Sequence, residues 1–138
     1  MVLGSHMNIR QEASALLNRI PDVGVLLEIH EGHAFPPLTE YHLQPVPESW
    51  NAPPPPDMVG GRRLVPVFKD GDSYTVYCID AATGQFIAID VEEPWPPEKE
   101  FSSCAEFKNY LFGLAAESRT EQVKGELRAR LGIGVSQP

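Results

Sequence analysis

The chain has 138 residues, of which 42% are hydrophobic and 22% are charged, values typical of a single globular domain. This composition excludes collagen, a coiled coil and a wholly disordered chain, and no apolar stretch approaches the roughly 20 residues that a membrane-spanning helix needs. Two features are unusual: the 14 prolines and the formal net charge of −8.

Residues 1–7 end in Gly-Ser-His-Met, which is typical of the remnant of a cleaved purification tag. We therefore expect one domain over residues 8–131, followed by a frayed tail at 132–138. No basic segment with an apolar core follows the remnant, so the sequence predicts no secretion signal. Cys78 and Cys104 are too few for a disulfide framework, and we expect reduced thiols and a cytoplasmic protein.

Two helices are predicted near the N-terminus. Residues 8–19 place apolar side chains on one helical face, namely Ile9, Ala13, Leu16 and Leu17, with Ile20 just beyond. Pro21 suits the first turn of a second element, because proline lacks the amide hydrogen that this position leaves unpaired. The apolar run after it fits a helix or a strand. We favour a short helix to Glu31 that ends at Gly32 in a left-handed conformation.

The segment 35–59 is rich in proline and includes a run of four prolines at 53–56. Such a run favours polyproline II and cannot join a central strand. We expect a long, mostly irregular connection with one short strand at 41–43. Because connections of this length are uncommon in compact domains, the segment is a candidate for a functional or mobile loop.

The next segment predicts an antiparallel sheet. Runs of β-branched and aromatic residues at 64–68, 74–79 and 85–91 are joined by short turns that contain glycine. The prolines within 94–97 are expected to end the sheet. The predicted fold class is α+β: a single domain in which a mostly antiparallel sheet of about three to five strands packs against N- and C-terminal helices.

Two helix-capping patterns follow the sheet. Ser103 with Glu106 three residues later is a capping-box pattern, and it predicts a helix to about residue 116. The buried face of this helix is expected to contain Phe107, Tyr110, Leu111 and Leu114. Ser118 and Glu121 repeat the pattern and predict a last helix, whose apolar residues lie four apart at Val123, Leu127 and Leu131.

The negative charge is concentrated in one segment. Residues 70–100 contain eight acidic side chains against Lys99 alone, a net charge of −7 out of the −8 of the whole chain. Such a surface repels the phosphate backbone of nucleic acids and attracts basic proteins. We therefore expect no direct nucleic-acid binding and a basic protein partner. The alternative is a solvated acidic surface that only aids solubility.

No motif predicts catalysis. His30 and His33 lie three residues apart across a glycine, whereas a zincin helix places its two histidines four apart, so we expect ordinary surface histidines there and at His42. Asp70 and Asp72 resemble the start of a calcium loop, but the later ligands do not follow, and a hairpin turn explains them. We expect no enzyme, cofactor or metal site. A hydrolase built on the two histidines and the glutamate between them is the alternative that would require a bound metal.

Both tryptophans lie next to prolines or in the proline-rich connection. Trp50 belongs to that connection, and Trp95 stands between prolines beside the acidic segment. Each ring can fold back onto the core to close its loop, or it can act as an aromatic anchor for a partner. Because acidic residues flank Trp95, the sequence favours the role of a partner anchor more for Trp95 than for Trp50.

Several short motifs follow one another between residues 64 and 114. They are Leu64-Val65-Pro66-Val67-Phe68, an acidic turn with glycine, Tyr77-Cys78-Ile79-Asp80, Gly84, a strand ending in Asp90, Phe101, and a helix with Phe107-x-x-Tyr110-Leu111. In this order they resemble the SMI1/KNR4 (SUKH) superfamily, and Ile20-Pro21 is similar to its N-terminal Leu-Pro helix. The sequence departs from the family at residues 30–33, which replace a usual double glycine, and at Ser73, where glycine is common.

The resemblance implies an α+β fold without a shared catalytic residue. It also implies, for many bacterial members, an immunity protein that binds and blocks a toxin domain; fungal members are linked to cell-wall synthesis. Since an acidic surface suits a basic nuclease toxin, our hypothesis is a non-enzymatic immunity protein. Its predicted partner-binding residues are Asp70, Asp72, Asp90, Glu92, Glu93 and Trp95. The alternative is a regulatory or scaffolding domain that binds a host protein through the proline-rich loop 44–58.

Overall fold

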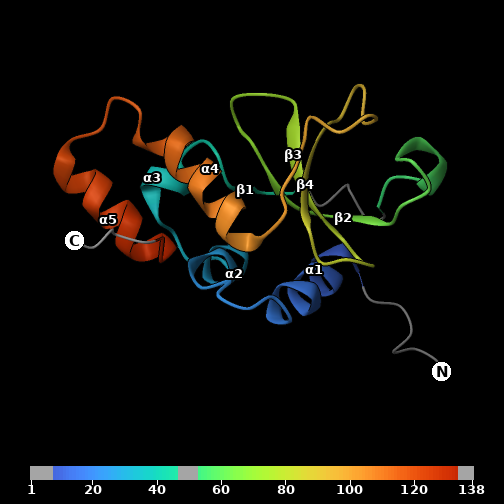
Figure 1. The fold of residues 1–138 in the computed structure, drawn as a ribbon, viewed down its shortest axis with the longest axis horizontal. Helices are drawn as coiled ribbons and strands as arrows, with labels where there is room; N and C mark the ends of the chain where they lie inside the picture. The colour runs from blue at the N-terminus through green and yellow to red at the C-terminus, as the bar shows by residue number, and fades with distance from the viewer. Residues whose placement is uncertain (1–7, 47–52, 134–138) are drawn as a thin grey trace.

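The sheet is a five-stranded antiparallel meander, in which each strand pairs with its neighbours in the sequence (Figure 1). The computed structural model describes residues 8–46 and 53–133. The strands are β1 (Gln44–Pro45), β2 (Leu64–Lys69), β3 (Thr75–Asp80), β4 (Phe86–Asp90) and β5 (Lys99–Glu100). The three long strands confirm the sequence prediction, because their β-branched and aromatic side chains suit a sheet that is covered on both faces.

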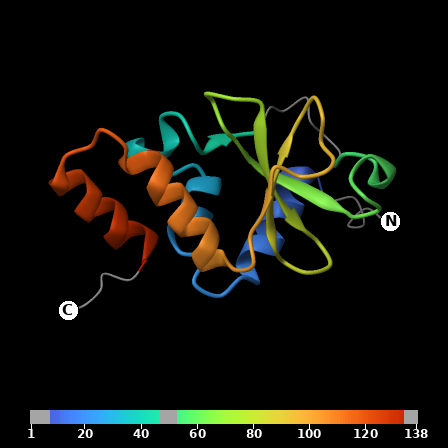
Figure 2. The same ribbon diagram turned by 45° about the horizontal axis from the view of Figure 1, so that its top comes forward.

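Helices cover one face of the sheet and extend away from it as a second layer (Figure 2). They are α1 (Ile9–Asn18), α2 (Val25–His30), α3 (Pro36–Thr39), α4 (Cys104–Ala116) and α5 (Glu121–Leu131), with a 3₁₀ turn, η2, at Pro56–Met58. Helix α1 packs on β2, and α5 packs on α4. The fold is therefore α+β. In the described ranges no helix combines the length and the apolar character that crossing a membrane requires.

Both faces of the central strand β3 are covered, and all six of its residues are buried. Toward the helices, the core includes Val65, Val67, Tyr77, Ile79, Phe86 and Phe107. On the opposite face, a smaller cluster consists of Val59, Leu64, Val76, Cys78, Ile87 and Ile89. Val59 follows the proline run, so part of the proline-rich connection belongs to the core.

Helix α4 is attached to the sheet by aromatic packing. The rings of Phe86 and Phe107 stack with their centroids 4.3 Å apart, and Phe101 contacts Phe107 at 5.0 Å. Ser103 Oγ accepts a hydrogen bond from the backbone nitrogen of Glu106, which confirms the predicted start of this helix. Of its predicted buried residues, Phe107 and Leu111 are fully buried, whereas Tyr110 and Leu114 are partly exposed.

The prediction for the N-terminal half is wrong in two places. The second helix begins at Val25 instead of Pro21, because Asp22 and Gly24 have positive φ angles (61° and 53°), which a right-handed helix does not allow. The predicted strand at 41–43 lies at Gln44–Pro45 instead and is preceded by α3, which the sequence analysis missed. Helix α3 has only four residues, too few for a helical periodicity.

Two details of the C-terminal half also differ from the prediction. The prolines within 94–97 do not end the sheet, since β5 pairs with Ile87 and Ala88 after them. Thr120 rather than Ser118 caps helix α5: Thr120 Oγ1 accepts a hydrogen bond from the backbone nitrogen of Val123. The predicted tag remnant, Trp50 and most of the predicted tail lie outside the described residues.

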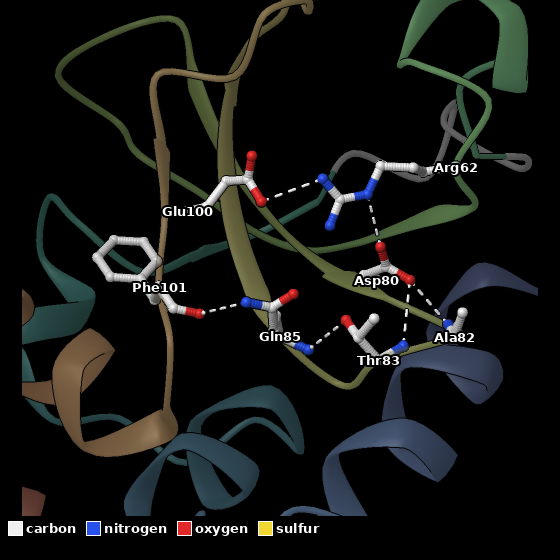
Figure 3. Close-up of polar contacts among 7 residues, drawn as sticks. All are labelled: Arg62, Asp80, Ala82, Thr83, Gln85, Glu100 and Phe101. Carbon is white, nitrogen blue, oxygen red and sulfur yellow. Dashed lines mark hydrogen bonds and ion pairs between the residues drawn. The ribbon is translucent and has the colours of Figure 1, made fainter.

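The buried carboxylate of Asp80 joins three parts of the fold (Figure 3). Its side chain is 3% exposed and accepts a hydrogen bond of 2.7 Å from Arg62 Nε. It also accepts hydrogen bonds from the backbone nitrogens of Ala82 and Thr83, which form the turn between β3 and β4. Arg62 continues the network to Glu100 on β5 at 3.1 Å. One carboxylate therefore holds the entry to β2, the β3–β4 turn and, through Arg62, the edge strand β5.

We expect Asp80→Ala to lower the free energy of unfolding by about 3 kcal/mol, because it breaks a buried ion pair and leaves two turn amides without an acceptor. Urea denaturation followed by circular dichroism measures this change. Glu93→Ala is the matched control: its side chain is exposed, and we expect a change within about 0.5 kcal/mol. Equal stability of the two variants would contradict the role assigned to Asp80.

Candidate protein-binding surface

Two acidic segments meet at one end of the sheet. The β2–β3 turn (residues 70–74) and the segment after β4 (residues 91–98) emerge at the same end, because Thr75 at the start of β3 pairs with Asp90 at the end of β4. The backbone nitrogen of Val91 donates a hydrogen bond to the carbonyl oxygen of Tyr74 at 3.0 Å, which continues the pairing one step further. Figure 1 shows the two loops projecting side by side from this end.

Four of the predicted partner-binding acids belong to this end. Asp72, Glu92 and Glu93 are exposed, and Asp90 is partly exposed. Asp90 Oδ1 accepts hydrogen bonds from the backbone nitrogens of Glu92 (2.8 Å) and Glu93 (3.4 Å), so it also shapes the turn. Within residues 8–46 and 53–133, none of these four carboxylates has a Lys or Arg nitrogen within 4.0 Å. Their negative charge is therefore available to a partner.

Asp70 does not share this exposure, although the sequence analysis placed it among the partner-binding residues. It is 6% exposed. Its Oδ1 atom accepts a hydrogen bond of 2.8 Å from the backbone nitrogen of Asp72, and its Oδ2 atom lies 3.4 Å from both Tyr77 Oη and His42 Nδ1. Asp70 therefore stabilises the turn from its buried side, and among the acids of this turn it is Asp72 that is exposed.

Trp95 is held against the protein by its neighbours. A Cβ atom added to Gly60 would lie 2.5 Å from Trp95 Cζ2, so the ring occupies the space that the missing side chain leaves. The guanidinium carbon of Arg62 lies 5.7 Å from the ring centroid, within the range of a cation–π contact. The residue is only 36% exposed. This packing favours the loop-closing role of Trp95 over the role of a partner anchor.

The sequence analysis missed the more exposed apolar side chains of this end. Tyr74 is 63% exposed and Val91 is 41% exposed. The backbone hydrogen bond between them places them side by side on two adjacent segments of the chain. Tyrosine is enriched at the centres of protein interfaces, because it buries a large apolar ring and keeps a polar hydroxyl. Its position directly after a Gly-Asp-Ser turn was the available signal, since a turn lies at the surface. We define the acidic end as Asp72, Tyr74, Asp90, Val91, Glu92 and Glu93.

The thiols and the paired histidines do not form an activated site in the described residues. Burial raises the pKa of the Cys78 thiol, and burial raises that of Cys104 despite the opposing charge of Lys108. A reactive cysteine requires the opposite shift. His30 Nε2 lies 3.2 Å from the carbonyl oxygen of Arg10, and burial lowers the pKa of this histidine. The imidazole of His30 thus contacts the backbone of α1.

Gly60 and Gly61 allow a direct test of the Trp95 packing. Both have positive φ angles (69° and 78°), but only Gly60 faces the ring. In a Trp50→Phe background, we expect Gly60→Ala to cost about 1–2 kcal/mol more stability than Gly61→Ala, because both substitutions strain the backbone and only the first displaces the indole. Intrinsic fluorescence should show a red shift of Trp95 emission in Gly60→Ala alone. An identical spectrum and stability for both variants would contradict this packing.

Comparisons with known proteins assign neither a family nor a function to this chain. A scan against protein-family models found no match, and searches of curated proteins and of solved structures found none either. The similarity to the SMI1/KNR4 superfamily therefore stays a prediction from the sequence. The function has to be argued from the acidic end itself.

Proposed function

We propose that this chain is a protein-binding domain that captures a basic protein through the acidic end. The observation that supports this most is the set of exposed carboxylates on two adjacent loops, none of which has a Lys or Arg partner within 4.0 Å among the described residues. Tyr74 supplies an apolar centre beside them. An aromatic residue surrounded by polar residues is the arrangement of a protein-interface hot spot.

The pattern of ion pairing distinguishes this end from other acidic parts of the surface. Asp80 and Glu100 share Arg62, while Glu12 pairs with Arg63 at 2.6 Å. These carboxylates are neutralised by their own chain. The carboxylates of the acidic end leave a net negative field instead, which accelerates the approach of a basic partner and weakens as salt is added.

The more specific form of the proposal is an immunity protein that occludes a basic, nuclease-type toxin. The resemblance to SMI1/KNR4 proteins and the acidic end support it independently. A nuclease binds phosphates with Lys and Arg side chains. The carboxylates on the two adjacent loops of the acidic end can form ion pairs with these Lys and Arg side chains of the nuclease. They would thereby block its access to nucleic acid. Neither catalysis nor a cofactor is needed for this inhibition.

We expect Glu92→Lys with Glu93→Lys to reduce capture of basic proteins at least tenfold in a pull-down from lysate of the native host at low salt, because the substitution inverts the local charge. Quantitative mass spectrometry measures the capture. Glu117→Lys with Glu126→Lys is the matched control, since both residues are exposed and the net charge changes equally. If the control loses capture to the same degree, net charge rather than the acidic end determines binding.

Tyr74→Ala tests the apolar centre of the same surface. We expect the captured partner to dissociate at least tenfold faster from this variant, while the stability of the free protein changes by no more than about 0.5 kcal/mol. Surface plasmon resonance measures the dissociation rate. Met58→Ala removes another exposed apolar side chain, 51% exposed, and should leave the rate unchanged. An unchanged rate in Tyr74→Ala would place the interface elsewhere.

The alternative function, binding through the proline-rich loop 44–58, has less support. The described end of this loop forms the 3₁₀ turn Pro56–Met58, which leads directly to the buried residue Val59. A partner that recognises polyproline II needs an extended and accessible segment. Deleting residues 53–56 should therefore leave capture by the acidic end intact, and loss of capture would favour the alternative.

A further inference from the structure

One imidazole and two carboxylates converge beside the acidic end. His42 lies just before β1, whereas Asp70 and Asp72 lie in the β2–β3 turn, 28 and 30 residues further along the chain. Their ligand atoms all lie within 4.8 Å of one another. The sequence analysis treated the histidine and the Asp-Gly-Asp turn separately, because nothing in the sequence connects them.

The separation between the ligand atoms of His42 and Asp70 suits two ligands of one metal ion and is long for a hydrogen bond. His42 Nδ1 and Asp70 Oδ2 are 3.4 Å apart. An N–H···O hydrogen bond has an ordinary length of about 2.7–3.2 Å. Two ligands bound tetrahedrally to Zn²⁺ at about 2.0–2.1 Å are separated by about 3.3 Å. The exposed side chain of Asp72 can rotate to supply the third ligand.

The Asp70 carboxylate also lacks a permanent counter-charge. Its side chain is 9% exposed, and in the described part of the chain no Lys or Arg nitrogen lies within 4.0 Å of it. The contact of its Oδ2 atom with Tyr77 Oη, at 3.4 Å, is longer than an ordinary hydrogen bond. Because a buried carboxylate without a paired cation is costly, a metal ion at Oδ2 would stabilise this arrangement.

The fold holds the two loops together without help from a ligand. The backbone nitrogen of Gly71 donates a hydrogen bond to the carbonyl oxygen of Tyr41, and that of His42 donates one to Leu38 at 3.0 Å. A Cβ atom on Gly71 would lie 2.7 Å from the side chain of Gln44, so the turn lies closely against the start of β1. The backbone segments that carry the ligands are thus held together in advance, which lowers the entropic cost of binding.

We propose that His42, Asp70 and Asp72 form a binding site for one divalent transition-metal ion of the Zn²⁺ type. An imidazole with carboxylates suits Zn²⁺, whereas Ca²⁺ takes six to eight oxygen ligands. Three protein ligands leave a coordination position for water or for a group from another molecule. The ion would fasten the β2–β3 turn, including Tyr74, to the chain before β1. The site shares Asp72 with the acidic end, but its metal binding can be measured without the proposed partner.

Isothermal titration of chelator-treated protein with ZnCl₂ tests the proposal. We expect one Zn²⁺ per chain in the wild type, with affinity reduced at least tenfold in His42→Ala and in Asp72→Asn. His33→Ala is the matched control, because it removes an exposed histidine outside the cluster and should retain wild-type affinity. Circular dichroism establishes that each variant is folded; Asp72→Asn changes an exposed side chain and keeps the fold testable.

A thermal melt gives a second measurement. Excess ZnCl₂ should raise the Tm of the wild type and of His33→Ala but not of His42→Ala, because a ligand that binds the folded state stabilises it. Absence of saturable one-to-one binding in the wild type would overturn the proposal. So would wild-type affinity in folded His42→Ala, or an equal loss of affinity in His33→Ala.

Discussion

The arrangement of the sheet depends on the ion pair between Arg62 and the buried carboxylate of Asp80. A carboxylate that is 3% exposed is tolerated only with a cation and hydrogen-bond donors around it. The chain provides these from the entry to β2 and from the β3–β4 turn, so both are held in place at once. Through Glu100 the same arginine reaches β5 (Figure 3). The register of the meander is thereby fixed at the end of the sheet opposite the acidic end.

Acidic side chains are buried and paired at one end of the sheet and exposed at the other. At one end, Asp80 is buried and paired, and it contributes to stability. At the other end, Asp72, Glu92 and Glu93 are exposed and have no described cationic partner within 4.0 Å. Natural surfaces normally mix both signs of charge. The end of the sheet that keeps one sign of charge, beside the exposed Tyr74, is the surface on which the proposed protein binding rests.

Trp95, in the segment after β4, and Tyr74, in the β2–β3 turn, differ in their packing. Trp95 fills the space above Gly60 and contacts Arg62, so it extends the Arg62–Asp80 network across the loop after β4. Tyr74 extends from the β2–β3 turn and is 63% exposed. The proposed metal site lies below this turn, at Asp70. The turn between β2 and β3 therefore carries exposed negative charge, an exposed tyrosine and two ligands of the proposed metal site.

The α+β class, the three long strands, α1 and α4 could be predicted from the sequence, because local patterns of apolar residues and helix caps specify them. The sequence also located most of the negative charge in residues 70–100. Which of these acids are buried and which are exposed depends on tertiary contacts: Asp70 and Asp80 are buried, whereas Asp72 and Glu92 are exposed. The tertiary structure also places the Trp95 ring against Gly60 and Arg62, and His42 Nδ1 at 3.4 Å from Asp70 Oδ2. Burial and pairing depend on contacts between residues far apart in the chain, and no local pattern encodes those contacts.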